Sequence, residues 1–174
     1  VAAWGLGAWW GFPPENQFRA TWIAVGWGLL AVLPMLALMF WIDRSSWRPW
    51  RRLMALVRRQ VAPMFAECTW LELALISALA GLGEEAMFRG VLQPGFASWW
   101  GIWPSLAVVS LLFGLAHMLT PAYFVLATAM GAYLGWLAIA TENLLVPVLA
   151  HALYDFLALS HMVRDVRSRP LSPP

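Results

Sequence analysis

Three ionisable side chains interrupt an apolar stretch that is otherwise long enough to cross a membrane. The stretch covers residues 71–92 and contains Glu84, Glu85 and Arg89. Each charge at the centre of a spanning helix costs roughly 2.5–3.5 kcal/mol on insertion scales, so three unpaired charges cost on the order of 8 kcal/mol. A spanning helix therefore keeps such a cluster only where other groups compensate it or where the cluster has a function.

The composition places the whole chain in a membrane. Hydrophobic residues make up 61% of the sequence and charged residues 11%, whereas a soluble domain carries about a quarter charged residues. A net charge of +2 is too small to favour a nucleic-acid partner. Cys68 is the only cysteine, which excludes an internal disulfide. The sequence opens on Val1 rather than Met, which indicates a piece of a longer protein.

The apolar pattern predicts an all-α fold, a polytopic transmembrane helix bundle with about five spans in this fragment. The spans are separated by an Arg-rich segment at residues 43–60, whose spacing is typical of an amphipathic helix lying in the interface, by a turn at Pro94-Gly95, and by short polar connections. The expected spans are residues 21–42, 71–92, 104–118, 122–140 and 144–163.

The distribution of arginine predicts the topology. Four expected spans separate the Arg-rich segment from the basic tail, so both lie on one side of the membrane, and that side is cytoplasmic by the positive-inside rule. The sequence divides into an N-terminal helix with the interfacial segment (residues 1–63), a four-helix core (residues 64–163) and a disordered basic tail (residues 164–174). We expect a multi-pass protein of a cell membrane, the bacterial cytoplasmic membrane being the expected one.

Polar side chains from three different spans reach a similar depth. At ~1.5 Å per helical residue, Glu84 lies roughly 15 Å from the expected turn at Pro94. By the same measure His117 lies roughly 20 Å, His151 roughly 12 Å and Asp155 roughly 18 Å from the ends of their own spans on that face. Hydrophobic patterning does not require this coincidence, which indicates a site.

The spacing within each span indicates what the site does. Glu85 and Arg89 are four residues apart and can pair on one helix face, as can His151 and Asp155. A carboxylate beside histidines in a water-poor cavity can act as a general base that takes a proton from a water molecule attacking a carbonyl. No serine or cysteine lies at a matching depth beside a base, so water is the expected nucleophile.

Three segments in order resemble the motifs of the CPBP family of intramembrane glutamic endopeptidases, which includes CAAX prenyl proteases and bacterial Abi or bacteriocin-processing proteins. The segments are E-E-A-M-F-R at residues 84–89, F-G-L-A-H at residues 113–117 and H-A-L-Y-D at residues 151–155. They match the family patterns E-E-x-x-x-R, F-x-x-x-H and H-x-x-x-N/D. The resemblance covers roughly residues 70–162.

The resemblance implies a catalytic role for six residues. Glu84 would activate the water with His117 as its catalytic partner, and Glu85 and Arg89 would organise the first motif. His151 and Asp155 would complete the oxyanion and substrate-positioning side. Position 155 departs from the best-known prenyl proteases, which have Asn there, and a carboxylate donates to an oxyanion only when protonated.

The resemblance implies a hydrolase without a cofactor, whose partners are a membrane-associated peptide or protein substrate and the lipid bilayer. Three alternatives stay open on the residues alone. Glu84, His117 and His151 can instead ligate zinc in a metal-dependent version of the protease. Intramembrane Glu, Arg and His also serve transporters and proton relays, although no inverted repeat is evident. The charges can also merely hold together the helices of an immunity or scaffold protein.

Overall fold

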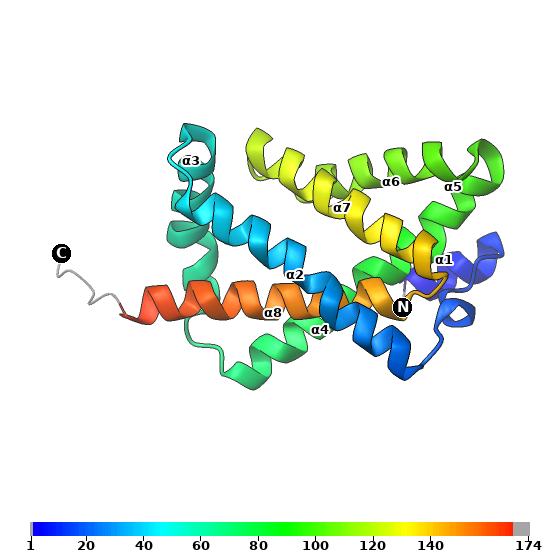
Figure 1. The fold of residues 1–174 in the computed structure, drawn as a ribbon, viewed down its shortest axis with the longest axis horizontal. Helices are drawn as coiled ribbons and strands as arrows, with labels where there is room; N and C mark the ends of the chain where they lie inside the picture. The colour runs from blue at the N-terminus through cyan, green and yellow to red at the C-terminus, as the bar shows by residue number, and fades with distance from the viewer. Residues whose placement is uncertain (1, 169–174) are drawn as a thin grey trace.

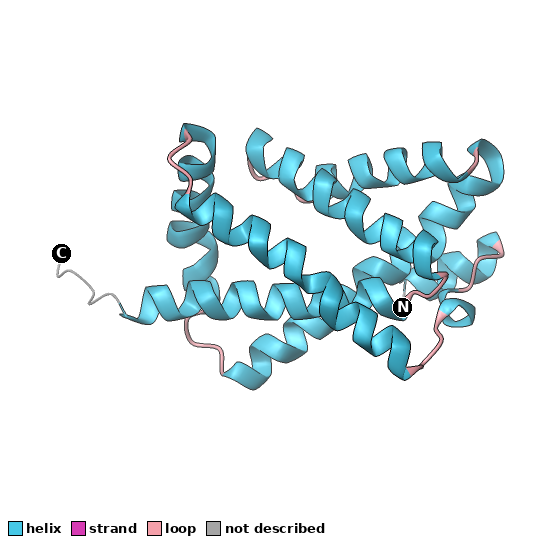
Figure 2. Ribbon diagram, in the orientation of Figure 1, coloured by secondary structure: helices cyan, strands magenta, loops and turns pink. Residues whose placement is uncertain are grey.

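The protein is described here by a computed structural model covering residues 2–168. These residues form helices joined by short loops, with no β-strand among them (Figure 2). The polytopic all-α bundle predicted from the sequence is confirmed. The last six residues of the predicted disordered tail, 169–174, lie outside the described part of the chain.

The N-terminal third holds the first helices. α1 (Ala2–Trp10) and the 3₁₀ turn η1 (Pro14–Gln17) precede α2 (Trp22–Arg44), whose first turn is capped by the Thr21 hydroxyl accepting from Ala24 N–H at 3.1 Å. α3 (Arg48–Leu56) continues through a π-helical turn, η2 (Val57–Val61), and a 3₁₀ turn, η3 (Ala62–Phe65).

The next helix starts at a reciprocal cap and runs further than expected. α4 (Trp70–Met87) begins where Thr69 and Glu72 cap each other, and it continues through the π-helical turn η4 (Phe88–Leu92) into α5 (Gln93–Trp100). The predicted turn at Pro94-Gly95 is wrong. Proline cannot donate to the carbonyl four residues earlier, and here Gln17 Nε2 donates to that carbonyl, Gly90 O, at 2.7 Å. The chain turns instead at Gly101, whose φ of 83° favours glycine.

The last three helices complete the bundle: α6 (Ile102–Ala116), α7 (Pro121–Thr141) and α8 (Leu145–Ser168). Among residues 2–168, three helices, α2, α7 and α8, are long and apolar enough to cross a membrane. A fourth span arises if the bent pair Arg48–Phe65 and Trp70–Trp100, inclined by 112°, is counted as one. The count is below the predicted five because α6 has 15 residues and its length of roughly 22 Å falls short of a ~30 Å hydrocarbon core.

Close packing of α4, α2 and α8 fixes the centre of the bundle. α8 packs on both α2 and α4, and α6 packs on α7 (Figure 1). Gly81 of α4 makes this possible, because a Cβ there would lie 2.9 Å from Ala152 Cβ on α8. A Cβ at Gly28 of α2 would likewise lie too close to Leu149 Cβ on α8. Apolar side chains from α2, α7 and α8, including Met35, form a core between these three helices.

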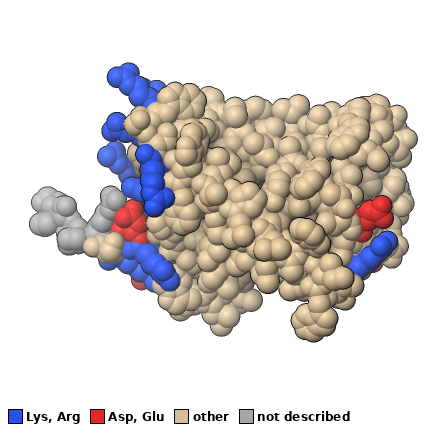
Figure 3. Space-filling view, in the orientation of Figure 1, with Lys and Arg blue, Asp and Glu red and all other residues tan. Residues whose placement is uncertain are grey.

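Most of the arginines gather at one end of the molecule, over α3 and the ends of α2 and α8 (Figure 3). Arg58 of η2 lies 2.5 Å from Asp43 of α2 and 3.4 Å from Asp165 of α8. The Arg-rich segment and the end of α8 therefore lie at the same end of the molecule, and their shared side of the membrane stays a prediction.

Candidate active site

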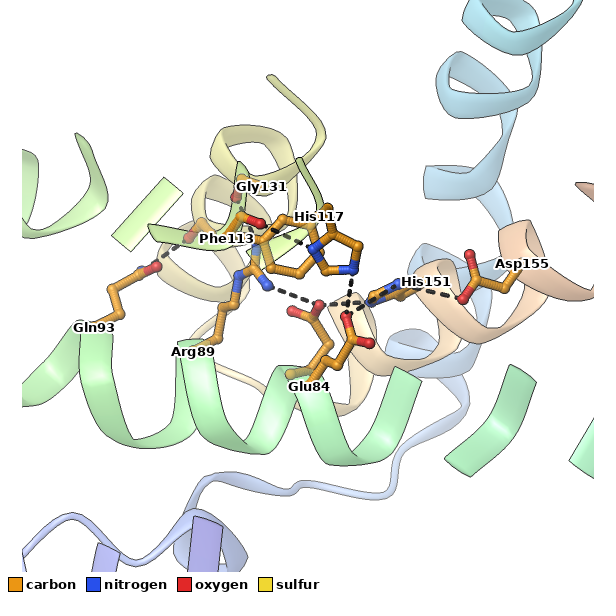
Figure 4. A network of polar contacts seen from close by, with 10 residues as sticks. Glu84, Arg89, Gln93, Phe113, His117, Gly131, His151 and Asp155 are labelled. Atoms are coloured by element: carbon orange, nitrogen blue, oxygen red, sulfur yellow. Dashed lines mark hydrogen bonds and ion pairs between the residues drawn. The ribbon is translucent and has the colours of Figure 1, made fainter. Parts of the chain in front are cut away.

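Glu84 and His117 face each other from two helices that lie far apart in the sequence. Glu84 Oε2 on α4 is 3.3 Å from His117 Nε2, at the end of α6 (Figure 4). The other ring nitrogen, His117 Nδ1, is 2.9 Å from the Phe113 carbonyl. A carbonyl only accepts, so Nδ1 carries a proton and Nε2 is the ring nitrogen that faces Glu84. Both side chains are partly open, 33% for Glu84 and 27% for His117.

Glu85 and Arg89 form a fully buried pair beside this contact. Arg89 Nη1 donates to Glu85 Oε1 at 2.9 Å, and neither side chain is exposed. The second guanidinium nitrogen donates to the Gly131 carbonyl of α7 at 2.8 Å, and the guanidinium lies 4.4 Å from the centre of the Phe113 ring. Arg89 neutralises the Glu85 carboxylate, and its contact with Gly131 joins η4 to α7. Both contacts compensate part of the cost of burying the two charges.

His151 joins the buried pair to the open part of the site. Its Nδ1 is 2.7 Å from Glu85 Oε1, so this nitrogen carries the proton that the carboxylate accepts. Its Nε2 is 4.0 Å from Glu84 Oε2 and 3.5 Å from Asp155 Oδ2. Asp155 is 29% exposed. The structure thus brings all six predicted residues into one network drawn from α4, η4, α6 and α8 (Figure 4).

Two supporting contacts with the backbone of α7, made by Arg89 and Gln93, were not predicted. Gln93 Nε2 donates to the Gly135 carbonyl at 3.1 Å, one helical turn from the Arg89 contact with Gly131. Glycines at both positions let these side chains reach the backbone of α7, because a Cβ at Gly135 would lie 2.6 Å from Gln93 Oε1. The four-residue spacing of Gly131 and Gly135, matching that of Arg89 and Gln93, is the sequence signal that could have identified the contact.

A protein-family model described as a type II CAAX prenyl endopeptidase, Rce1-like, matches residues 66–157, which is more than half of the chain. The chain belongs to this family. As a CAAX-type endopeptidase relative it is a membrane protein of the protease class, and the resemblance seen in the three motifs is confirmed. Comparisons with curated proteins and with solved structures each found no match.

The three motifs of this CAAX endopeptidase relative all fall inside the matched region. Among residues 2–168, no group of three or more His, Cys, Asp and Glu side chains is arranged to hold a metal ion. The zinc alternative predicts a loss of activity with a chelator.

Proposed function

We propose that this chain is an intramembrane glutamic peptidase that hydrolyses a membrane-associated peptide or protein near its end. The observation that carries the proposal is the 3.3 Å distance between Glu84 Oε2 and His117 Nε2, since both atoms are hydrogen-bond acceptors when the histidine ring is neutral. Glu84 Oε2 is buried and has no hydrogen-bond partner among the described residues. Two adjacent acceptors can each accept one hydrogen from the same water, which leaves the oxygen lone pairs free for attack.

The reaction then follows general-base chemistry. The water oxygen bonds to the carbonyl carbon while one water proton passes to Glu84, forming a tetrahedral oxyanion and a protonated carboxyl group. Breakage of the C–N bond restores the carbonyl, and the proton held by Glu84 passes to the leaving amine. Glu84 ends the cycle ionised, and His117 holds the water without a net change of its own.

We propose that His151 and Asp155 stabilise the oxyanion. Because His151 Nδ1 donates to Glu85, its Nε2 can donate only when the ring is an imidazolium. Asp155 Oδ2, at 3.5 Å, supplies the negative charge that stabilises that imidazolium, so the carboxylate acts through the histidine where relatives use the amide of Asn. Glu85 and Arg89 act as positioning residues.

We further propose that residues 64–163 carry the chemistry and that residues 1–63 support them. The protein lies in a cell membrane as a multi-pass chain, with its Arg-rich end in the cytoplasm. The hydrogen bond from Gln17 Nε2 to Gly90 O, which joins the N-terminal part to the helix that carries Glu84, supports this division.

Cleavage of a quenched membrane-peptide library by the purified chain tests the mechanism. We expect Glu84→Gln and His117→Ala to abolish hydrolysis while the variants stay folded, because each removes one of the two acceptors. Glu15→Gln is the matched control, since Glu15 is exposed and lies outside the network. Retained hydrolysis in Glu84→Gln contradicts the mechanism, and loss of wild-type activity with a chelator moves the chemistry to zinc.

A further inference from the structure

The Arg-rich end of the molecule holds a cavity that none of the six candidate site residues lines. A cavity of about 540 Å³ lies between the end of α2 and the helix formed by α3 and η2. Arg51, Arg58 and Arg59 line one wall, and these positions share one helix face by their spacing. The opposite wall comes from the end of α2 and the residues after it, with Ile42, Asp43, Ser45 and Ser46.

The charges in this cavity do not balance. Arg58 is paired with Asp43 at 2.5 Å and also contacts Asp165, and Asp43 is the only acidic residue of the lining. Within residues 2–168, the side chains of Arg51 and Arg59 have no ion pair or hydrogen bond. Two guanidinium groups with no anionic partner therefore face the same cavity.

The polar groups beside the arginines are donors suited to a phosphate. Ser45 Oγ accepts from Trp47 N–H at 3.3 Å, which leaves its hydroxyl hydrogen available for donation. Ser46 contributes a second hydroxyl to the lining. Guanidinium groups bind phosphate oxygens through paired N–H donors, which a lysine cannot reproduce.

The position in the fold favours a lipid as the source of the phosphate. Figure 3 shows most of the visible arginines at one end of the molecule and a middle part without charged residues, and Figure 1 shows α3 running crosswise to α8 at that end. Trp41 and Trp47 beside the cavity are 60% and 57% exposed, as expected for side chains at the level of lipid headgroups. Basic pockets at the cytoplasmic ends of membrane helices bind anionic headgroups.

We propose that this cavity binds the phosphate group of an anionic phospholipid, with Arg51 and Arg59 as its charge partners and the hydroxyls of Ser45 and Ser46 as further donors. Binding there joins the end of α2 to α3 through the headgroup. The proposal does not rest on peptide hydrolysis, because the cavity shares no residue with the Glu84 site.

The test is a titration of the full chain in neutral detergent with phosphatidylglycerol, phosphatidylcholine or inorganic phosphate, followed by native mass spectrometry. We expect Arg51→Gln combined with Arg59→Gln to weaken phosphatidylglycerol binding roughly tenfold or more. Arg51→Lys combined with Arg59→Lys keeps the charge and loses the paired donors, so its affinity falls between those of the wild type and the glutamine variant. Arg48→Gln combined with Arg52→Gln is the matched control, since it also removes two charges, both from α3 and both outside the cavity lining.

Selective binding of phosphatidylglycerol over phosphatidylcholine, lost in the Arg51/Arg59 glutamine variant and retained in the Arg48/Arg52 control, supports the proposal. An equal loss in the Arg48/Arg52 control overturns it, because the attraction then comes from interfacial charge in general. Inorganic phosphate binding as tightly as the lipid also overturns it, because the ligand is then a free anion. Peptide hydrolysis by the same variants in detergent is expected to be unchanged, which separates this result from the proposed peptidase function.

Discussion

Asp155 lies 3.5 Å from His151 Nε2, and its carboxylate stands where well-known relatives carry Asn. We expect Asp155→Asn to retain hydrolysis within about tenfold of the wild type, because the carboxamide N–H replaces the imidazolium as an oxyanion donor. Asp155→Leu supplies neither a charge nor a donor, and we expect it to lower kcat on the order of a hundredfold. Kinetics on one cleaved peptide measure both.

The comparison of the two variants decides the role of position 155. If Asp155→Asn is as inactive as Asp155→Leu, the carboxylate has a role that an amide cannot replace. Thermal unfolding of both variants serves as the control, because Asp155 is partly exposed and neither replacement is expected to unfold the bundle.

At the level of elements, the contact between α4 and α8 sets the distance between the carboxylates and His151. A Cβ at Gly81 would lie 2.9 Å from both the Cβ and the backbone N of Ala152, so Gly81→Ala must push the two helices apart. We expect a loss of stability of about 1–3 kcal/mol and a fall in hydrolysis, since Glu84 and Glu85 lie one turn further along α4. Thermal unfolding in detergent and peptide cleavage measure these effects.

Gly83 provides the matched control on the same helix. A Cβ at Gly83 meets nothing within 4 Å, so Gly83→Ala is expected to be neutral or slightly stabilising, by up to about 1 kcal/mol. Equal effects of the two substitutions would show that helix α4 tolerates or rejects alanine irrespective of its contact with α8.

Across the whole molecule, the sequence predicted which six candidate residues come together better than it predicted the course of the chain around them. The six site residues were identifiable because a four-residue spacing fixes a helix face and because charges in an apolar span demand partners. The unbroken helix through Pro94 was not predictable, since the carbonyl that Pro94 leaves unpaired, Gly90 O, accepts from Gln17 Nε2 in a distant part of the chain. The contact of Gln93 with Gly135 was missed although two matching four-residue spacings signal it, because spacing alone does not show which helices face each other.

The single cysteine tests the orientation of the whole bundle. Cys68 is partly buried at the Arg-rich end, where its carbonyl accepts from Arg167 at 2.7 Å. Glu15 is exposed at the opposite end, beside the connection between α7 and α8, where Leu144 N–H donates to Gln17 O at 2.9 Å. An impermeant maleimide applied to intact cells should therefore reach the two positions differently.

We expect Cys68 to be labelled only after the membrane is permeabilised, because the positive-inside rule puts the Arg-rich end in the cytoplasm. In a Cys68→Ser background, Glu15→Cys should be labelled in intact cells. The Cys68→Ser chain, which has no cysteine, gives the background signal. Labelling of Cys68 from outside and of position 15 only after permeabilisation would reverse the topology, and Asp155, which lies toward the Arg-rich end of α8 from His151, would then lie toward the outer side of the site.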